Sequence, residues 1–268
     1  MFKLQLFFFR LLYYFFKIGY PFGIIKWADH KRYESLYLET IKNSYKDIDD
    51  YENKEKYKVD KEWLNNLAYT TQVVIKDSEI NYQHGRVLYT ELSKYINKIQ
   101  TNYLNILETG TARGFSSLCM AKSLSDMKQK GRIFTIDILP HNKKIIWNCV
   151  EDINGFKTRQ ELLSKWSDLT RDIKFIEGKS MQVLNKIDIN RVNFAFLDGA
   201  HNLKSVKFEY EWVKNRQKKN DIIIFDDYSS EDFSGIFHLV NQIEKDKIYN
   251  IKKLFSKNNR GYAIAVKH

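Results

Sequence analysis

Beyond residue 100, short apolar runs alternate with stretches of helical periodicity, and this alternation constrains the fold more than any other feature of the sequence. It is typical of β-α-β units, in which parallel strands form one sheet covered by helices. The last two runs are separated only by the turn-like residues 256–260, so we expect them to pair as an antiparallel hairpin. The seven expected strands are residues 103–108, 132–138, 173–177, 194–198, 222–226, 249–255 and 261–267.

The first expected strand runs directly into the sequence ETGTARGFSS, residues 108–117, and a helix is expected to follow. Gly110 and Gly114 allow the backbone to turn tightly and to approach a ligand without an intervening Cβ. The helix start adds free N–H donors for a carboxylate. A short glycine pattern is also compatible with any nucleotide-binding turn or with a purely structural one. The two glycines are, however, spaced one residue further apart than in a dinucleotide fingerprint.

Carboxylates follow the fourth and fifth expected strands, which should be neighbours in a parallel sheet. Asp198 closes the fourth strand, and Asp226 and Asp227 close the fifth. Ligands bind at the carboxyl ends of such strands, so these three side chains are expected to share one cleft. Three like charges repel unless a cation lies among them, and Mg²⁺ prefers oxygen ligands. The sequence therefore predicts a site for Mg²⁺ or another divalent cation formed by these three residues.

The loop at residues 108–117 resembles the first motif of class I S-adenosylmethionine-dependent methyltransferases, in the branch of sugar and macrolide O-methyltransferases. The resemblance covers roughly residues 80–268. It implies a Rossmann-like seven-stranded sheet of five parallel strands plus the C-terminal antiparallel hairpin, flanked by helices. It also implies that S-adenosylmethionine is the cofactor, with Gly110 and Gly114 along its methionine portion and Glu108 fixing the loop. The other cofactor-binding residues implied in this loop are Thr111, Ala112, Ser116 and Ser117.

The ends of the next two strands complete the expected cofactor site. Asp137 ends the second strand, where its carboxylate could accept both hydroxyls of a ribose. An acid there serves NAD and S-adenosylmethionine equally, and a helix-capping Asp is the simpler alternative. By the resemblance, Gly178, Lys179 and Ser180 border the adenine at the end of the third strand. Asp198 is expected to touch the sulfonium end of the cofactor as well as the metal.

His201 lies three residues beyond Asp198 and is the expected general base. The resemblance extends to metal-dependent O-methyltransferases, in which a Lys or a His at this offset removes the proton from the acceptor hydroxyl. A neutral imidazole suits that role near pH 7, although a lone His is more often a cap or a surface residue. Lys204 is the reserve candidate, and we assign His84 a structural role.

The first 62 residues lie outside the resemblance. Residues 1–27 are apolar around nearly the whole circumference of a helix, with Arg10 and flanking lysines. Three alternatives are open: a helix lying in the membrane interface, a helix buried in an oligomer or against the catalytic domain, and a transmembrane or signal segment. Residues 28–62 are expected to form a charged connector, and the stretch from residue 41 to about residue 62 is expected to be either solvated or an irregular helix. Residues 63–268 are expected to form the methyltransferase domain.

Charge and cysteine content bear on partners and location. The formal net charge of +11 suggests an anionic neighbour, such as a membrane surface or an acidic substrate, or merely compositional drift. No Lys/Arg run is dense enough to indicate nucleic-acid binding. The 2 cysteines, Cys119 and Cys149, have no metal or redox spacing and are expected to be reduced packing residues. We therefore expect a cytoplasmic enzyme, peripheral at the inner face of the cytoplasmic membrane if residues 1–27 bind lipid, with a homo-oligomer as a further option.

The sequence and the resemblance together predict metal-assisted methylation of a hydroxyl on a small-molecule sugar or a glycan. Two departures from the resemblance stand out: Arg113 puts a cation beside the cofactor loop, and the long charged segment 143–172 is a candidate substrate lid. Two other functions stay open. One is a nicotinamide-dependent oxidoreductase or epimerase, which the terminal hairpin and the Asp226–Asp227 pair disfavour. The other is a non-catalytic, membrane-associated protein with a vestigial fold.

Overall fold

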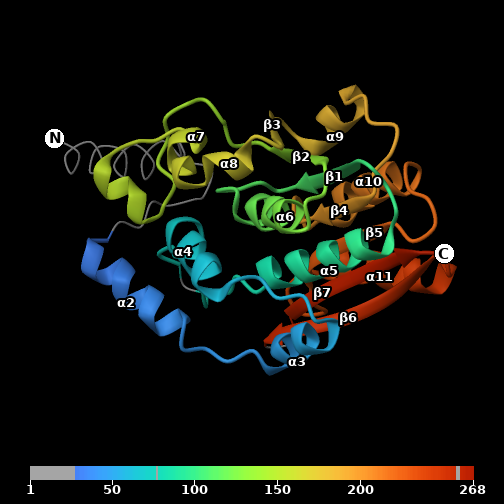
Figure 1. The fold of residues 1–268 in the computed structure, drawn as a ribbon, viewed down its shortest axis with the longest axis horizontal. Helices are drawn as coiled ribbons and strands as arrows, with labels where there is room; N and C mark the ends of the chain where they lie inside the picture. The colour runs from blue at the N-terminus through green and yellow to red at the C-terminus, as the bar shows by residue number, and fades with distance from the viewer. Residues whose placement is uncertain (1–27, 77, 258–259) are drawn as a thin grey trace.

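The computed structural model describes residues 28–76, 78–257 and 260–268, and within them one seven-stranded sheet organises the chain (Figure 1). Its strand order is β3-β2-β1-β4-β5-β7-β6, with β7 antiparallel to both β5 and β6 and the remaining pairs parallel. The expected Rossmann-like α/β fold is confirmed. The strands are β1 (Leu104–Thr109), β2 (Gly131–Asp137), β3 (Ile173–Glu177), β4 (Phe194–Leu197), β5 (Ile222–Tyr228), β6 (Tyr249–Lys257) and β7 (Arg260–Lys267).

Two hydrophobic cores form, one on each face of the sheet. Successive side chains of a strand point to opposite faces, so Phe194 and Phe196 enter one core while Ala195 and Leu197 enter the other. The first core is covered by α2 (His30–Thr40), α3 (Lys46–Glu55), α4 (Lys61–Thr71), α5 (His84–Lys98), α6 (Phe115–Asp126), η1 (Val150–Asn154), α7 (Arg159–Leu162), η2 (Ser164–Trp166) and α8 (Ser167–Thr170). The second is covered by α9 (Ser180–Val183), η3 (Leu184–Lys186), α10 (Leu203–Lys214) and α11 (Ser234–Asp246).

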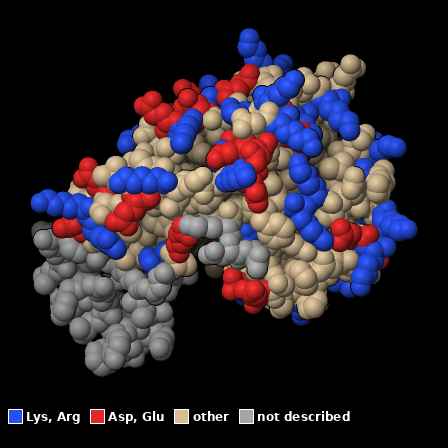
Figure 2. All heavy atoms as spheres, turned by 90° about the horizontal axis from the view of Figure 1, so that it is seen from below, with Lys and Arg blue, Asp and Glu red and all other residues tan. Residues whose placement is uncertain are grey.

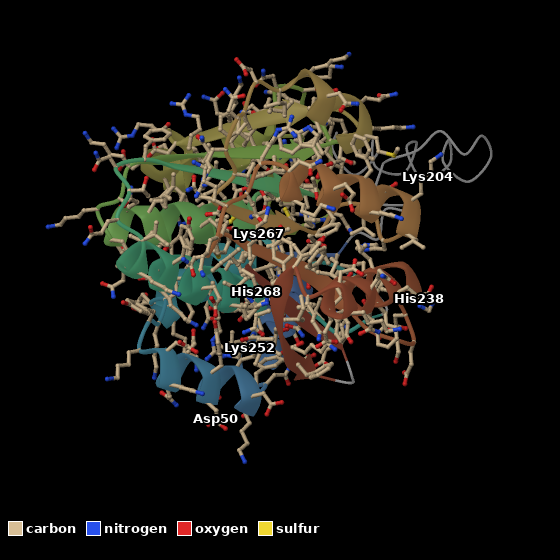
Figure 3. All side chains as sticks on the ribbon, turned by 90° about the vertical axis from the view of Figure 1, so that its right-hand side faces the viewer. Asp50, Lys204, His238, Lys252, Lys267 and His268 are labelled. Carbon is tan, nitrogen blue, oxygen red and sulfur yellow. The ribbon has the colours of Figure 1, made fainter. Side chains whose placement is uncertain are left out.

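The segment expected to be a solvated connector or an irregular helix forms regular helices that pack against the domain. Helix α3 buries Ile48, Tyr51 and Glu52, a stripe three and four residues apart on one face of an otherwise charged helix. The Tyr51 hydroxyl donates to the buried carboxylate of Glu91 on α5. On the other side, the ammonium of Lys252 on β6 lies 4.1 Å from the centroid of the Tyr51 ring, and Figure 3 shows Lys252 beside α3. These three inward-facing residues pack the helix against the domain. Because the rest of the helix is charged, the apolar periodicity of its sequence is too weak to predict this packing.

The charged segment expected to be a substrate lid packs beside the cofactor loop and α6. Trp147 and Cys149 within it are completely buried, and Ile145 pairs with Lys157 in a short antiparallel bridge. The Asp152 carboxylate accepts the backbone N–H groups of Trp147 (2.8 Å) and Cys149 (3.0 Å). Cys119 and Cys149 are both buried and free, in agreement with the sequence prediction.

The described part of the chain can be compared with the expectations of membrane contact and of an anionic partner. No helix in the described part of the chain is both long enough and apolar enough to cross a bilayer. The segment 1–27, for which an interfacial membrane helix is one of three alternatives, lies outside the described residues. On the face in Figure 2, basic and acidic side chains are interspersed.

Candidate active site

The cofactor loop turns sharply where β1 ends. Gly110 and Gly114 both have left-handed backbone conformations, with φ of +92° and +90°, and α6 begins directly after Gly114. The Gly110 N–H donates to the carbonyl of Ile136 at 2.9 Å, which ties the loop to β2. A Cβ at Gly110 would lie 2.0 Å from the carbonyl oxygen of Asp198. The reason for glycine here is therefore the close approach of the chain leaving β4, and not, as the sequence suggested, only the approach of a ligand.

Glu108 supports this loop from behind. Its carboxylate is completely buried and accepts the hydroxyls of Ser116, Ser117 and Thr135. Burial raises the pKa of Glu108, and the three hydroxyl donors oppose that rise by stabilising the charged form. The Thr111 hydroxyl bonds to the Thr135 hydroxyl in the same buried network. These side chains join β1, β2 and the start of α6.

A cavity of about 740 Å³ lies along the carboxyl edge of the first strands. Seven of the expected cofactor-binding residues line it: Gly110, Ala112, Asp137, Gly178, Lys179, Ser180 and Asp198. The other five, Glu108, Thr111, Gly114, Ser116 and Ser117, do not line it. Other residues that line the cavity were not expected from the sequence, among them Ile138, Met181, Gln182, Gly199, Ala200 and Ser205. Of these, Ile138 could have been found, because it ends the second expected strand and so lies at the carboxyl edge of the sheet, where ligands bind.

Asp137 holds the floor of this cavity in place. One oxygen of its carboxylate accepts the Ala112 N–H at 2.6 Å, and the other accepts the Leu139 N–H at 2.8 Å. Asp137, which is predicted to bind the ribose hydroxyls, thus also links the cofactor loop to the end of β2.

Two buried guanidinium groups brace the loop from the opposite side. Arg113 donates from Nε to the Trp147 carbonyl and points into the segment 143–172, away from the cavity. Arg159 of α7 donates from Nε to the Ala112 carbonyl at 3.0 Å, and burial lowers its pKa to about 10. Arg159 also lies over the Trp147 ring, 5.3 Å from the centroid. Arg113, the cation that the sequence puts beside the cofactor loop, is therefore part of the scaffold.

A second cluster adjoins the cavity. Ligand atoms of Asp198, His201 and Asp227 all lie within 4.8 Å of one another. The His201 Nδ1 lies 3.6 Å from the Asp227 Oδ2, is buried, and has no hydrogen-bond partner among the described residues. The His201 ring rests against Phe233, with the centroids 4.7 Å apart. Asp198 belongs both to this cluster and to the cavity wall, so the two form one continuous site.

The backbone is strained where it presents Asp227. This residue has φ of +56°, a conformation uncommon outside glycine, at the register shift of β5 against β7. Strain of this kind clusters at functional sites. Arg260, at the start of β7, donates from Nε to the Asp227 Oδ1 at 2.6 Å, which leaves the Oδ2 facing His201. No sequence pattern indicated Arg260, because only the antiparallel pairing of β7 brings it to the carboxyl edge of the sheet beside Asp227.

Asp226 lies beside this cluster but is not among the three grouped residues. Its Oδ1 accepts the Asp227 N–H at 2.7 Å, and its side chain lines a small neighbouring cavity with Lys76, His84 and Arg260. The His84 ring stacks on Phe196, 6.0 Å between centroids, and burial together with the nearby cations lowers its pKa to about 3. His84 is therefore neutral at physiological pH.

The three carboxylates carry more negative charge than Arg260 neutralises. Burial raises the pKa of Asp198 strongly, and the charges of Asp226 and Asp227 raise it further. Burial also raises the pKa of Asp227, again reinforced by Asp226. A cation added to the cluster would relieve this repulsion. The carboxylate oxygens of Asp198 and Asp227 fit a divalent ion such as Mg²⁺. Lys204, the reserve base, is an exposed residue of the first turn of α10 (Figure 3).

Comparison with known proteins agrees with this geometry. The family model described as a methyltransferase domain matches residues 107–228, from the end of β1 to the end of β5. No curated protein matches the sequence. Residues 107–228 of this chain are therefore similar to a methyltransferase domain.

Solved structures share the fold at low identity. The O-methyltransferase TomG from Streptomyces achromogenes, in complex with SAM, has a TM-score of 0.56 and 15% identity over 90% of this chain and 99% of that one. The SAH-bound Podospora anserina methyltransferase PaMTH1 gives 0.54 and 15% over 92% and 99%. An O-methyltransferase from Bacillus cereus, in complex with SAH, gives 0.51 and 15% over 100% of each chain. The class I methyltransferase fold is therefore confirmed.

Proposed function

We propose that this chain, whose methyltransferase domain has the class I fold, transfers a methyl group from S-adenosylmethionine to a hydroxyl oxygen with the help of a divalent cation. The observation that supports it most is the shared position of Asp198, which lines the 740 Å³ cavity and belongs to the acidic cluster with His201. A donor in the cavity and an acceptor at the cluster would then meet at that residue. The structures that share this fold include proteins named as O-methyltransferases and bound to SAM or SAH.

The cavity suits the methyl donor. Backbone groups of Gly110 and Ala112 would lie along its methionine portion, and Asp137 would accept the ribose hydroxyls. Gly178, Lys179 and Ser180 would border the adenine, with the exposed Ile138 offering an apolar surface. Glu108, Thr111, Ser116 and Ser117 act indirectly, by fixing the loop through the buried hydrogen bonds to Thr135 and to one another.

His201 is the proposed general base. Its Nδ1 faces the Asp227 carboxylate, so Nε2 is the nitrogen available to take the hydroxyl proton. As the proton moves to His201, the oxygen forms a bond to the methyl carbon and the carbon–sulfur bond of the donor breaks, leaving S-adenosylhomocysteine. Alignment of oxygen, carbon and sulfur at near-attack distance would supply much of the rate gain.

Asp198 and Asp227 are the proposed metal ligands, with Asp226 contributing negative charge from the neighbouring cavity. A divalent ion there would lower the pKa of a hydroxyl lying against it. The Asp227 Oδ2 is free of Arg260 and is the oxygen best placed for this role. Mg²⁺ is the proposed ion, because carboxylate oxygens suit it and it retains open positions for an acceptor.

The acceptor and the location of the enzyme are proposed on the sequence alone. A sugar hydroxyl, free or on a glycan, is the proposed methyl acceptor. We also propose that residues 1–27 hold the enzyme at the cytoplasmic face of a membrane, with a homo-oligomer as the alternative use of that apolar segment.

The test is an acceptor screen. Purified full-length protein would be incubated with labelled S-adenosylmethionine, Mg²⁺ and a set of free sugars and glycans, and S-adenosylhomocysteine release would be measured. We expect release with at least one hydroxylated acceptor and its loss when a chelator replaces Mg²⁺. Release that is unchanged by chelator would contradict metal assistance. Tight binding of NAD in place of S-adenosylmethionine would instead support the oxidoreductase alternative.

A further inference from the structure

A second cavity, of about 450 Å³, lies wholly in the N-terminal helical layer. Its walls come from the loop between α2 and α3, from α3 and α4, and from the first turn of α5. None of its lining residues falls within residues 107–228, which match the methyltransferase family model. The cavity therefore lies outside the part of the chain that the family model matches.

A buried carboxylate in this cavity lacks a partner for one of its oxygens. Glu52 is 4% exposed, and its Oε2 accepts a hydrogen bond from Arg86. Its Oε1 is buried and has no hydrogen-bond partner among the described residues. Leaving a buried acceptor unsatisfied costs about 1–3 kcal/mol, and more for a charged group. A ligand that brings a hydroxyl or N–H donor to this oxygen would recover that energy.

The surrounding groups favour a hydroxyl-rich, uncharged ligand. The Arg86 guanidinium is already engaged by Glu52 and by Asp49, to which it donates at 2.6 Å, so its positive charge is balanced. The side chains of Asn65 and Gln83 add amide groups to the wall. The Tyr82 ring, 3% exposed, adds an apolar surface, and its hydroxyl donates to the Asn65 Oδ1 at 2.8 Å. Carboxylate, amides and an aromatic ring together suit the alternating polar and apolar faces of a sugar ring.

This cavity lies beside the small cavity that contains Asp226. Gln83 lines it, while the next residue, His84, lines the small cavity that contains Asp226. The two cavities are also joined by a hydrogen bond, since the Asn43 Nδ2 donates to the Glu79 Oε1 at 3.0 Å. Asn43 belongs to the wall of the first cavity and Glu79 to the wall of the second.

We propose that the cavity around Glu52 is a distal subsite that binds a neutral sugar unit of the methyl acceptor, an inference that rests on the proposed function. The Glu52 Oε1 accepts a hydroxyl of that unit, and the Tyr82 ring lies against its apolar face. The helical layer thereby selects acceptors that extend beyond the methylated unit.

The test measures binding directly, without metal or methyl donor. The probes are the methyl glycosides of glucose, galactose, mannose, rhamnose and N-acetylglucosamine, titrated into the full chain and followed by saturation-transfer NMR. We expect at least one to bind with a dissociation constant of about 1–10 mM, as is reasonable for so small a ligand. Glu52→Gln should weaken that binding about tenfold or more, because a charge-assisted hydrogen bond is lost.

Two further variants make the result specific. Glu55 lies on the same helix as Glu52, but its carboxylate pairs with Lys94 and Lys252 and does not line the cavity. Glu55→Gln should therefore leave glycoside binding unchanged. Ser44→Trp, at an exposed position of the wall, should abolish binding by filling the cavity while thermal melting stays near that of the wild type. Equal binding by the Glu52 variant, or no binding of any glycoside, overturns the subsite.

Glucose 1-phosphate separates a sugar site from an anion site. If only this phosphate binds, with an affinity that falls as salt rises, the lysines at the rim form an anion site and the proposal is wrong. The proposed function has its own readout, since methyl transfer to the small acceptors of the screen depends on the acidic cluster and not on Glu52. Failure of glycoside binding thus leaves that function standing, and failure of methyl transfer leaves the binding result interpretable.

Discussion

Replacing Gly110 by alanine should destabilise the domain at the junction of β1 and β4. The left-handed φ of +92° costs a residue with a Cβ about 1–3 kcal/mol. In addition, the new Cβ would lie 2.0 Å from the Asp198 carbonyl oxygen, and a backbone atom cannot give way cheaply. The chain leaving β4 would have to shift by more than about 1 Å to restore an ordinary contact. We therefore expect the free energy of unfolding to fall by more than about 4 kcal/mol, a decrease that few single substitutions cause.

Gly155→Ala is the matched control. Gly155 has a similar φ of +104°, but a Cβ there would meet no atom within 4 Å. It should lose only the conformational part, about 1–3 kcal/mol. Denaturant unfolding of both variants, together with calorimetric S-adenosylmethionine binding, measures the difference. If Gly110→Ala is no less stable than Gly155→Ala, the close approach of the two strands does not exist and the reasoning fails.

Three other predictions follow from the site and the chain. His201→Ala should retain metal and donor binding while turnover falls by about 10²–10⁴ and recovers partly at higher pH, where solvent takes the proton; a pH profile parallel to that of the wild type would exclude His201 as the base. The pKa of Asp227 is raised to about 6, so protons should compete with Mg²⁺ below that pH. Because burial raises the pKa of Asp227, the apo protein loses stability as the pH rises through 6 and this carboxyl ionises. Mg²⁺ should therefore raise the melting temperature clearly at pH 7.5, where the carboxylate is ionised, and little at pH 5, where it is protonated. An equal shift at both pH values would contradict this account. Deleting residues 1–27 should leave a folded domain that binds S-adenosylmethionine but no longer floats with anionic liposomes, and loss of folding in the truncated chain would remove the membrane proposal.

The centre of the sheet was predictable because β4 and the first four residues of β5 are continuously apolar and are buried on both faces. Phe194 to Leu197 illustrate this, since alternate residues enter different cores and none is polar. The packing of helix α3 was not predictable, because its buried Tyr51 is held by partners far along the chain, Glu91 and Lys252. Tertiary contacts of this kind cannot be found from a local pattern, and three buried residues in a charged helix give only a weak one.

The acidic cluster was predictable in outline only. The end of a strand fixes where Asp198 and Asp227 lie in the sheet, but the side-chain directions depend on the backbone. The left-handed conformation of Asp227 turns its carboxylate towards His201 and Arg260. Asp226 faces the neighbouring cavity instead. A sequence pattern places these two adjacent residues together and cannot separate their roles.

Binding of a divalent ion to the acidic cluster tests the central claim most directly. Mn²⁺, a spectroscopic substitute for Mg²⁺, would be titrated into the full chain loaded with S-adenosylmethionine and followed by electron paramagnetic resonance. We predict one ion per chain, lost in Asp198→Asn and Asp227→Asn and weakened less in Asp226→Asn, with donor affinity within a few-fold of the wild type throughout. Asp246→Asn, on the last turn of α11 and away from the cluster, should change nothing. An ion that stays bound when Asp198 and Asp227 are replaced, or no bound ion in the wild type, would contradict the account.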